Sequence, residues 1–435
     1  MKLLDGVTDV RPLRSSAAFR RLWVSSICVT LGHQLAVVAV LAQVWELTGS
    51  SVAVGAIGLA QALPMVVFGL FGGTLADAVD RRKLVVATTS GQFVAAVLLA
   101  AQAFAGVGSL WVVLVLVGAQ AGFQGLGAPA RKTFVVGLLP ADEVAAGLAL
   151  TNLSFQAAML AGPALGGVLT AHGGAGLAYA VDALTLLVGI YGIAGLPSLR
   201  PDGGGSRPGL RTTREGLRYV LRGRVVGGAV LTDLVSTVPA MPVALFPAVN
   251  AERFGGAPET LGLFLSAIAV GGVAAGSVSG LFSRVRRVGR AQLLAAGVWG
   301  LAIAGFGLVG SLWLTLGCLA VAGAADTVAV VTRGALVQLA VPDSHRGRVS
   351  AVEHVVGIAG PDLGNFRGGL VAGATSAAFA AVSGGLLCVA GIAVLAATNR
   401  PLRRFTIPGP GPHTAPDDTT PPGDTDADGR PARSG

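Results

Sequence analysis

The chain has 435 residues, of which 53% are hydrophobic and only 12% are charged, and its mean hydropathy is +0.71. A soluble domain usually has charge on about a quarter of its residues, so this composition excludes that class. The 65 glycines follow no three-residue period, which excludes collagen; in a membrane chain they favour close approach of helices.

Long apolar runs separated by charge, Gly or Pro predict an all-α polytopic membrane protein with twelve transmembrane helices. The first six are expected at about 22–46, 52–76, 84–105, 109–129, 146–170 and 175–196. The next six are expected at about 225–249, 259–282, 290–309, 311–332, 349–372 and 376–398. The runs are too long for a β-barrel. The basic N-terminal arm leads into a first run that continues as a span, so no cleavable signal peptide is expected.

The positive charges predict the orientation of these helices. Of the 31 Lys and Arg residues, only Arg253 and Arg367 fall outside the arm, tail and loops on one side, which leaves 29 there. The positive-inside rule places that side and both termini in the cytoplasm, so we expect a protein of the cytoplasmic membrane. The net charge of +9 does not indicate nucleic-acid binding, because the charges lie in short clusters between apolar runs.

Four parts of the chain are expected. Residues 1–198 form an N-terminal six-helix half, 199–224 a basic cytoplasmic linker, 225–399 a C-terminal six-helix half and 400–435 a cytoplasmic tail. The end of the linker, Glu215 to Arg224, could form an amphipathic helix on the membrane surface. The tail from Pro408 is rich in Pro, Gly, Asp and Thr, which predicts disorder.

The two halves repeat each other at a fixed offset. Gly-Ser-Leu-Trp at 108–111 returns at 310–313, an offset of 202, and at the same offset Arg131 matches Arg333. One register over several helices indicates duplicated six-helix halves, which is the plan of a large class of transporters.

The loop after the second predicted helix has a specific motif, Gly73-Thr-Leu-Ala-Asp77-Ala-Val-Asp80-Arg81-Arg82-Lys83. It resembles the signature loop of the major facilitator superfamily, and departs from it at residue 78, an Ala where Arg is frequent, and at Asp80, where Gly is frequent. The resemblance implies a conformational latch formed by Gly73, Asp77, Arg81 and Arg82. Alternatively, the basic residues only set the topology. The second half has Gly280 at the position of Asp77, so the latch is expected on one side only.

The fifth predicted helix contains Gly162-Pro163-Ala-Leu-Gly166-Gly167. This run resembles the end of the antiporter motif of exporting members of the superfamily, although Ala158 stands where Gly is common. Gly and Pro would kink the helix and allow close packing, and packing alone is the other interpretation.

Three further stretches resemble the enterobactin-exporter-like branch of the superfamily: Leu-Thr-Gly-Ser at 47–50, Arg-Gly-Arg-Val-Ser at 346–350 and Gly-Gly-Leu-Leu-Cys at 384–388. With the signature loop, the resemblance covers about residues 16–400. It implies export of a siderophore, drug or other secondary metabolite.

Ionisable residues inside the predicted spans are candidates for coupling, because each costs about 2.5–3.5 kcal/mol at a helix centre. The candidates for binding protons or substrate are Asp233, Asp326, Arg333, His33, Glu353 and Asp362. Asp182 and Arg367 also lie in spans, and a structural role is open for each residue of this set. Asp326 and Arg333 are seven residues apart and share a helix face, so an ion pair between them is one alternative. Asp233 and Asp326 lie deepest, which predicts coupling centred on the second half.

No pattern for an enzyme, metal or cofactor occurs. The sequence lacks a Walker loop, His-Glu-x-x-His and Gly-x-Ser-x-Gly, and its three cysteines lie far apart in apolar runs. The superfamily's Arg in the fourth helix is replaced here by Ala121. We therefore expect no enzymatic activity, no cofactor and no metal.

Together these patterns predict a monomeric secondary transporter of the major facilitator fold that binds a small organic substrate and protons within the lipid bilayer, with no nucleic-acid partner. It would export the substrate in exchange for protons by alternating access. An uptake carrier of the same superfamily and a non-transporting sensor on the same scaffold remain alternatives.

The signature loop generates a first prediction. Asp77→Asn should impair transport at normal membrane levels, because the lost charge would serve switching and not folding. Substrate export and membrane abundance are measured together; normal export by the variant would refute the latch.

Overall fold

The computed structural model describes residues 9–198, 210–278 and 286–406, and in these ranges every regular element is a helix. The first half contains α1 Arg11–Ser15, α2 Ala17–Thr48, α3 Ser51–Ala78, α4 Arg81–Phe104, α5 Leu110–Leu138 and α6 Val144–Ala194. A linking helix, α7 Leu210–Arg222, follows. The second half contains α8 Arg224–Ala240, η1 Val243–Leu245, α9 Phe246–Arg253, α10 Pro258–Ser277, α12 Val288–Leu308, α13 Leu312–Ala340, α14 Asp343–Ala374, α15 Ala377–Thr398 and α16 Arg400–Arg404.

Ten helices of the described ranges are long and apolar enough to cross a membrane, and one of these spans counts α8, η1 and α9 together. The 51-residue α6 is two helices joined at Gly174, whose φ of 67° only glycine adopts readily. Along its first leg the neighbours on α2 run from Trp23 to Gln34, and along the second they return to Ser25. The legs are therefore antiparallel, as the two expected spans 146–170 and 175–196 require.

The eleventh expected span, 349–372, corresponds to α14, which is 32 residues long. It is absent from the ten apolar helices because of its polar and charged residues. The count of twelve thus depends on α14 crossing the membrane despite its charge, and in this respect it stays a prediction.

The seventh expected helix, 225–249, lies within one candidate span, Arg224–Arg253, but the helix is broken inside that span. It stops at Ala240, passes through an extended Met241 and restarts as η1 and α9. Pro242 explains the break, because proline lacks the N–H that a helix needs and disfavours helical backbone at the preceding residue.

Side chains of α14 satisfy the backbone groups freed at this break. Arg367 donates from Nη1 to the Pro239 carbonyl, and the Asn365 Oδ1 accepts from the Ala244 N–H at 3.2 Å. Because no water is available in the hydrocarbon core, such partners are what allow a discontinuous span. Arg367 therefore has a structural partner, which its sequence position alone did not reveal.

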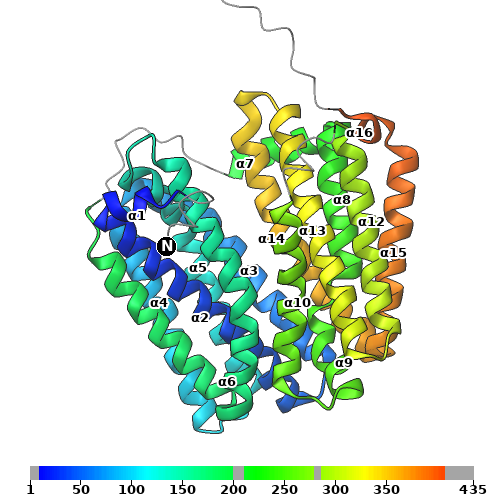
Figure 1. Cartoon of the computed structure of the whole chain (residues 1–435), viewed down its shortest axis with the longest axis horizontal. Coiled ribbons are helices and arrows are strands. Elements are labelled where there is room, and N and C mark those ends of the chain that lie inside the picture. The colour runs from blue at the N-terminus through cyan, green and yellow to red at the C-terminus, as the bar shows by residue number, and fades with distance from the viewer. Residues whose placement is uncertain (1–8, 199–209, 279–285, 407–435) are drawn as a thin grey trace, which may run out of the picture.

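The helices of the two halves form two bundles that lie close at one end and diverge toward the end where α1, α7 and α16 lie (Figure 1). Near the close end, a Cβ added to Gly58 of α3 would lie 2.8 Å from the Asp362 carbonyl of α14. A Cβ added to Gly167 of α6 would lie 2.7 Å from the Pro258 carbonyl of α10. Two pairs of helices thus join the halves, and glycine allows both contacts.

The linking helix α7 begins earlier than the expected amphipathic helix, at Leu210, and ends at Arg222. It contacts the start of α14, where Arg348 and Glu215 form an ion pair of 3.1 Å. The ring of Tyr219 stacks on that of His345 with centroids 4.9 Å apart. The expected disordered tail from Pro408 lies outside the described residues.

The topology generates a second prediction. Tags inserted after Arg404 or within 202–210 should be labelled only from the cytoplasm, and a tag at Gly256 only from outside, because of the 29-to-2 charge asymmetry. Labelling of intact and permeabilised cells measures this. An external tag at 202–210 would show that the number of preceding spans is odd.

Candidate functional site

A charged cluster among the described residues is centred on Arg333 of α13. Its Nη1 forms an ion pair with Oδ1 of Asp233 on α8, and its Nε lies 3.8 Å from Oε1 of Glu353 on α14. The three side chains are only 13–18% exposed. One guanidinium thus connects the helices that correspond to spans seven, ten and eleven.

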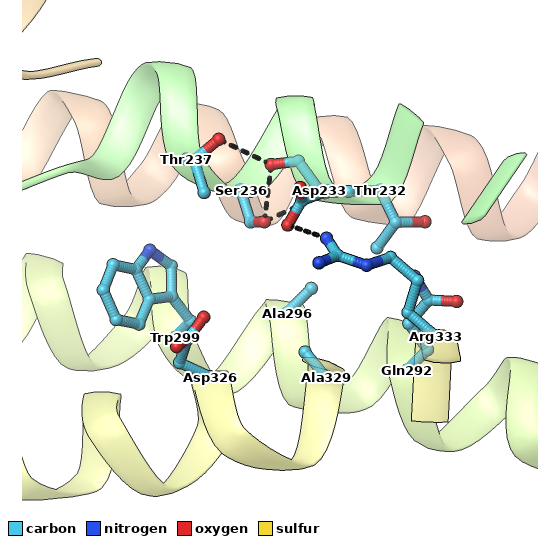
Figure 2. Close-up of a pocket in the computed structure, with 10 residues that line it drawn as sticks. All are labelled: Thr232, Asp233, Ser236, Thr237, Gln292, Ala296, Trp299, Asp326, Ala329 and Arg333. Atoms are coloured by element: carbon cyan, nitrogen blue, oxygen red, sulfur yellow. Dashed lines mark hydrogen bonds and ion pairs between the residues drawn. The ribbon is translucent and has the colours of Figure 1, made fainter. Parts of the chain in front are cut away.

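The local sequence of α8 positions Asp233. The hydroxyls of Ser236 and Thr237 donate to the Asp233 carbonyl at 2.9 and 2.8 Å, and Thr232 donates to Gly228. Hydroxyls that bond one turn back satisfy themselves within the helix and often bend it slightly. These hydroxyls therefore bind the backbone of Asp233 and not its carboxylate, which pairs with Arg333 (Figure 2).

Asp326 lies in the same pocket as this ion pair, but no ion pair of Asp326 occurs among the described residues. Figure 2 shows Asp326 beside Trp299, while Arg333 extends toward Asp233. Asp326 is exposed, whereas Asp233 is 13% exposed. The alternative that Asp326 pairs with Arg333 was therefore wrong, because Asp233 on another helix takes that position.

The pocket also contains polar atoms that have no partner in the described part of the chain, the Nε1 of Trp299 and the Oε1 of Gln292. The other end of the Gln292 amide donates to the Ala229 carbonyl at 2.9 Å. The cavity is about 10 Å³, close to the space that one water molecule needs. The pocket can thus bring one small polar species to two carboxylates, Asp233 and Asp326, and to Arg333.

Asp362 occupies a different place, a cavity of about 60 Å³ between the halves. Gln61 of α3 and Asn365 of α14 are its other polar side chains, and apolar residues of α2, α3 and η1 cover the rest. No ion pair of Asp362 occurs among the described residues. This cavity lies beside the contact between Gly58 and Asp362, at the closed end of the space between the bundles.

His33 lies partly exposed on α2, away from the Arg333 cluster. No hydrogen bond or ion pair of His33 occurs in the described ranges. The structure therefore brings together Asp233, Asp326, Arg333 and Glu353, and leaves His33 and Asp362 apart from them.

The first half has a buried acid that was not among the coupling candidates. Asp182 of α6 is 1% exposed, and its Oδ2 accepts from Gln120 of α5 at 2.9 Å. Its Oδ1 has no partner in the described part. The sequence places Asp182 inside a predicted span, which marks it as an ionisable residue in the membrane. Its partner Gln120 lies on another helix, and no spacing along the chain relates the two residues.

A polar network lies one turn from Asp182. The Tyr179 hydroxyl donates to Gln43 at 2.9 Å, and the amides of Gln43 and Gln102 exchange hydrogen bonds of 3.2 and 3.1 Å. All three side chains are buried, and each polar group has a partner, so this network connects α2, α4 and α6 without charge.

The motif on α6 mediates packing on two sides. A Cβ added to Gly166 would lie 2.7 Å from the Leu35 carbonyl of α2, whereas Gly167 faces Pro258 of the other half. Gly162 faces Gln34, and Pro163 faces Gly262 of α10. The close packing that this motif predicted is observed.

The signature loop is only partly described. Gly73 lies in α3, and the side chain of Asp77 lies outside the described residues. Asp80, which departs from the superfamily pattern, caps α4 by accepting from the Arg82 N–H at 2.9 Å. The buried Nε of Arg81 has no partner in the described ranges. The latch therefore stays a prediction.

The ion pair generates a third prediction. Arg333→Gln should lower the free energy of unfolding by about 3–5 kcal/mol, because it leaves buried carboxylates without a counter-ion. The double variant Asp233→Asn, Arg333→Gln should be less destabilised than the sum of its single variants. Thermal unfolding of the purified protein tests this. Asp326→Asn is the matched control and should cost less; additive losses in the double variant would contradict the pairing.

Comparisons with known proteins agree with this architecture. The profile of the family described as transmembrane secretion effector matches residues 7–407. The enterobactin exporter EntS of Citrobacter koseri is 27% identical over 405 residues, covering 93% of this chain and 97% of the exporter.

Solved structures show the same fold at low identity. A POT family transporter in complex with 5-aminolevulinic acid has a TM-score of 0.72 at 11% identity, covering 89% of this chain and 97% of its own. A D-xylose-proton symporter has a TM-score of 0.68 at 13% identity, covering 89% and 99%. The chain belongs to the transmembrane secretion effector family and is a multi-pass membrane transporter of the major facilitator superfamily.

Proposed function

We propose that this transporter exports a small organic molecule in exchange for protons by alternating access. The observation that supports it most is the cluster of acids near Arg333: Asp233 pairs with it, Glu353 lies 3.8 Å from it, and Asp326 lines the same pocket as the pair. Three acids against one base are an unfavourable arrangement inside a membrane unless the acids bind protons or a cation. Binding a proton there changes the charge that three helices share, and so connects protonation to helix position.

The contacts between the halves support the alternating part of the proposal. The described contacts of α3 with α14 and of α6 with α10 lie toward one end of the bundles, and the bundles diverge toward the other (Figure 1). Rocking about such contacts would close the divergent end and open the other. The loop at Gly73, Asp77, Arg81 and Arg82 would then serve as the latch of the divergent end.

The direction and the cargo are proposed from the relatives. The similarity to enterobactin exporters covers nearly the whole chain, so we propose export of a siderophore or a related secondary metabolite. The cavity beside Asp362 and Asn365 would form the end of the substrate site, because it lies between the halves. We place the protein in the cytoplasmic membrane as a monomer with both termini inside, as its charges predict.

Proton flux in vesicles gives the fourth prediction. The purified chain is reconstituted with a pH-sensitive dye inside, and enterobactin is the first probe. We expect the wild type to move protons against substrate. Asp326→Asn should abolish this coupled movement, yet keep exchange of substrate down its own gradient, because the acid is lost and the fold is not.

Asp182→Asn is the matched control, since it removes a buried acid of the other half, and coupling should survive in it. Full proton-coupled transport by Asp326→Asn would exclude this acid as the coupling site. Proton movement in the same direction as substrate would indicate an uptake carrier. Absence of any flux with siderophores, macrolides and sugars would favour a sensor.

A further inference from the structure

A groove of about 580 Å³ lies on the first half, between the start of α2 and the end of α6. Arg20, Arg21 and Val24 of α2 line one wall, and Val188 and Tyr191 of α6 line the other. These segments belong to α2 and the second leg of α6, which lie side by side in Figure 1. The groove is separate from the Arg333 pocket and from the cavity between the halves.

Two glycines of α6 shape this groove. A Cβ added to Gly192 would lie 2.7 Å from the Cβ of Ser25, and one added to Gly195 would lie 3.0 Å from Nη1 of Arg21. The same Nη1 is 3.5 Å from the Gly195 carbonyl, at the limit of a hydrogen bond. Without side chains on these glycines, α6 approaches α2 and the guanidinium of Arg21 can lie across the groove.

The chemistry of the walls changes along the groove. Arg20 and Arg21 lie near the start of α2, where the span begins, and both are exposed. One turn deeper, Val24 is 45% exposed and faces the groove with Val188, which is 40% exposed. Tyr191 is 85% exposed and lies between these levels, as aromatic side chains do at a membrane interface.

This order fits an amphipathic anion that lies along the membrane normal. Arginine forms bidentate hydrogen bonds with phosphate oxygens, and valine side chains suit an acyl chain. The end of the molecule where both arginines lie is the end that the charge pattern assigns to the cytoplasm, and the cytoplasmic leaflet is the one that carries anionic lipid.

We propose that this groove binds one anionic phospholipid, with its phosphate on Arg20 and Arg21 and an acyl chain along Val24 and Val188. The lipid bridges α2 and α6 within one half, so it stabilises that bundle. The site does not depend on transport, because every wall of the groove belongs to the first half.

The fifth prediction follows, and its measurement is the unfolding temperature of the full chain in detergent. Added phosphatidylglycerol should raise the Tm more than phosphatidylcholine with the same acyl chains. The variant Arg20→Gln, Arg21→Gln should lose this difference, and Arg20→Lys, Arg21→Lys should keep most of it. Val188→Trp, which fills the groove without changing charge, should also lose it.

Arg218→Gln, Arg222→Gln is the matched control, because it removes two exposed arginines of α7 outside the groove; the difference should persist in it. An equal loss in this control would show unspecific charge attraction and overturn the site. A rise of the same size with glycerol phosphate would show a phosphate site without a lipid. Equal effects of both lipids on the wild type would also overturn the proposal.

Discussion

The cost of charge in hydrocarbon determines how this molecule is arranged. A charged side chain at a helix centre costs about 2.5–3.5 kcal/mol, and a polar or charged group that meets it offsets part of that cost. Arg333 is met by Asp233 and Glu353, and Arg367 by the carbonyl of Pro239. The contacts of Arg333 join α8, α13 and α14. The contact of Arg367 with Pro239 allows α8 to end inside the span.

The duplicated halves use the same arginine differently. Arg131 matches Arg333 at the offset of 202, but its Nη2 donates to the Thr89 hydroxyl at 2.6 Å. A hydroxyl stays neutral, whereas a carboxyl group has both a charged and a neutral form. Among the described residues, an ion pair of the repeated arginine with a carboxylate therefore occurs in the second half, although Asp182 shows that the first half also contains a buried acid.

The sequence predicted what depends on the order of residues along one helix. Long apolar runs, basic clusters and the repeat led to the helices and the two halves, and the resemblance of the loop after the second helix led to the superfamily. The Gly and Pro run of α6 led to its close packing. The break after Ala240 was missed, although Pro242 was a local signal. The partner of Arg333 was missed for another reason. Helical spacing relates Asp326 to Arg333 because both lie on α13, whereas Asp233 lies on α8. Which side of α8 faces α13 depends on the rotation of α8 about its axis, which residue spacing does not determine. The pairing of Asp182 with Gln120 was hidden in the same way.

The central claim is that an acid beside the repeated arginine of the second half binds the transported proton. Infrared difference spectra of the protein in lipid, recorded between acidic and alkaline pH, report the protonation of individual carboxyl groups directly. The account predicts a carboxylic acid band that disappears with rising pH in the wild type and is absent from Asp326→Asn. A band unchanged in Asp326→Asn and lost in Asp182→Asn would contradict it, and would place the proton in the first half.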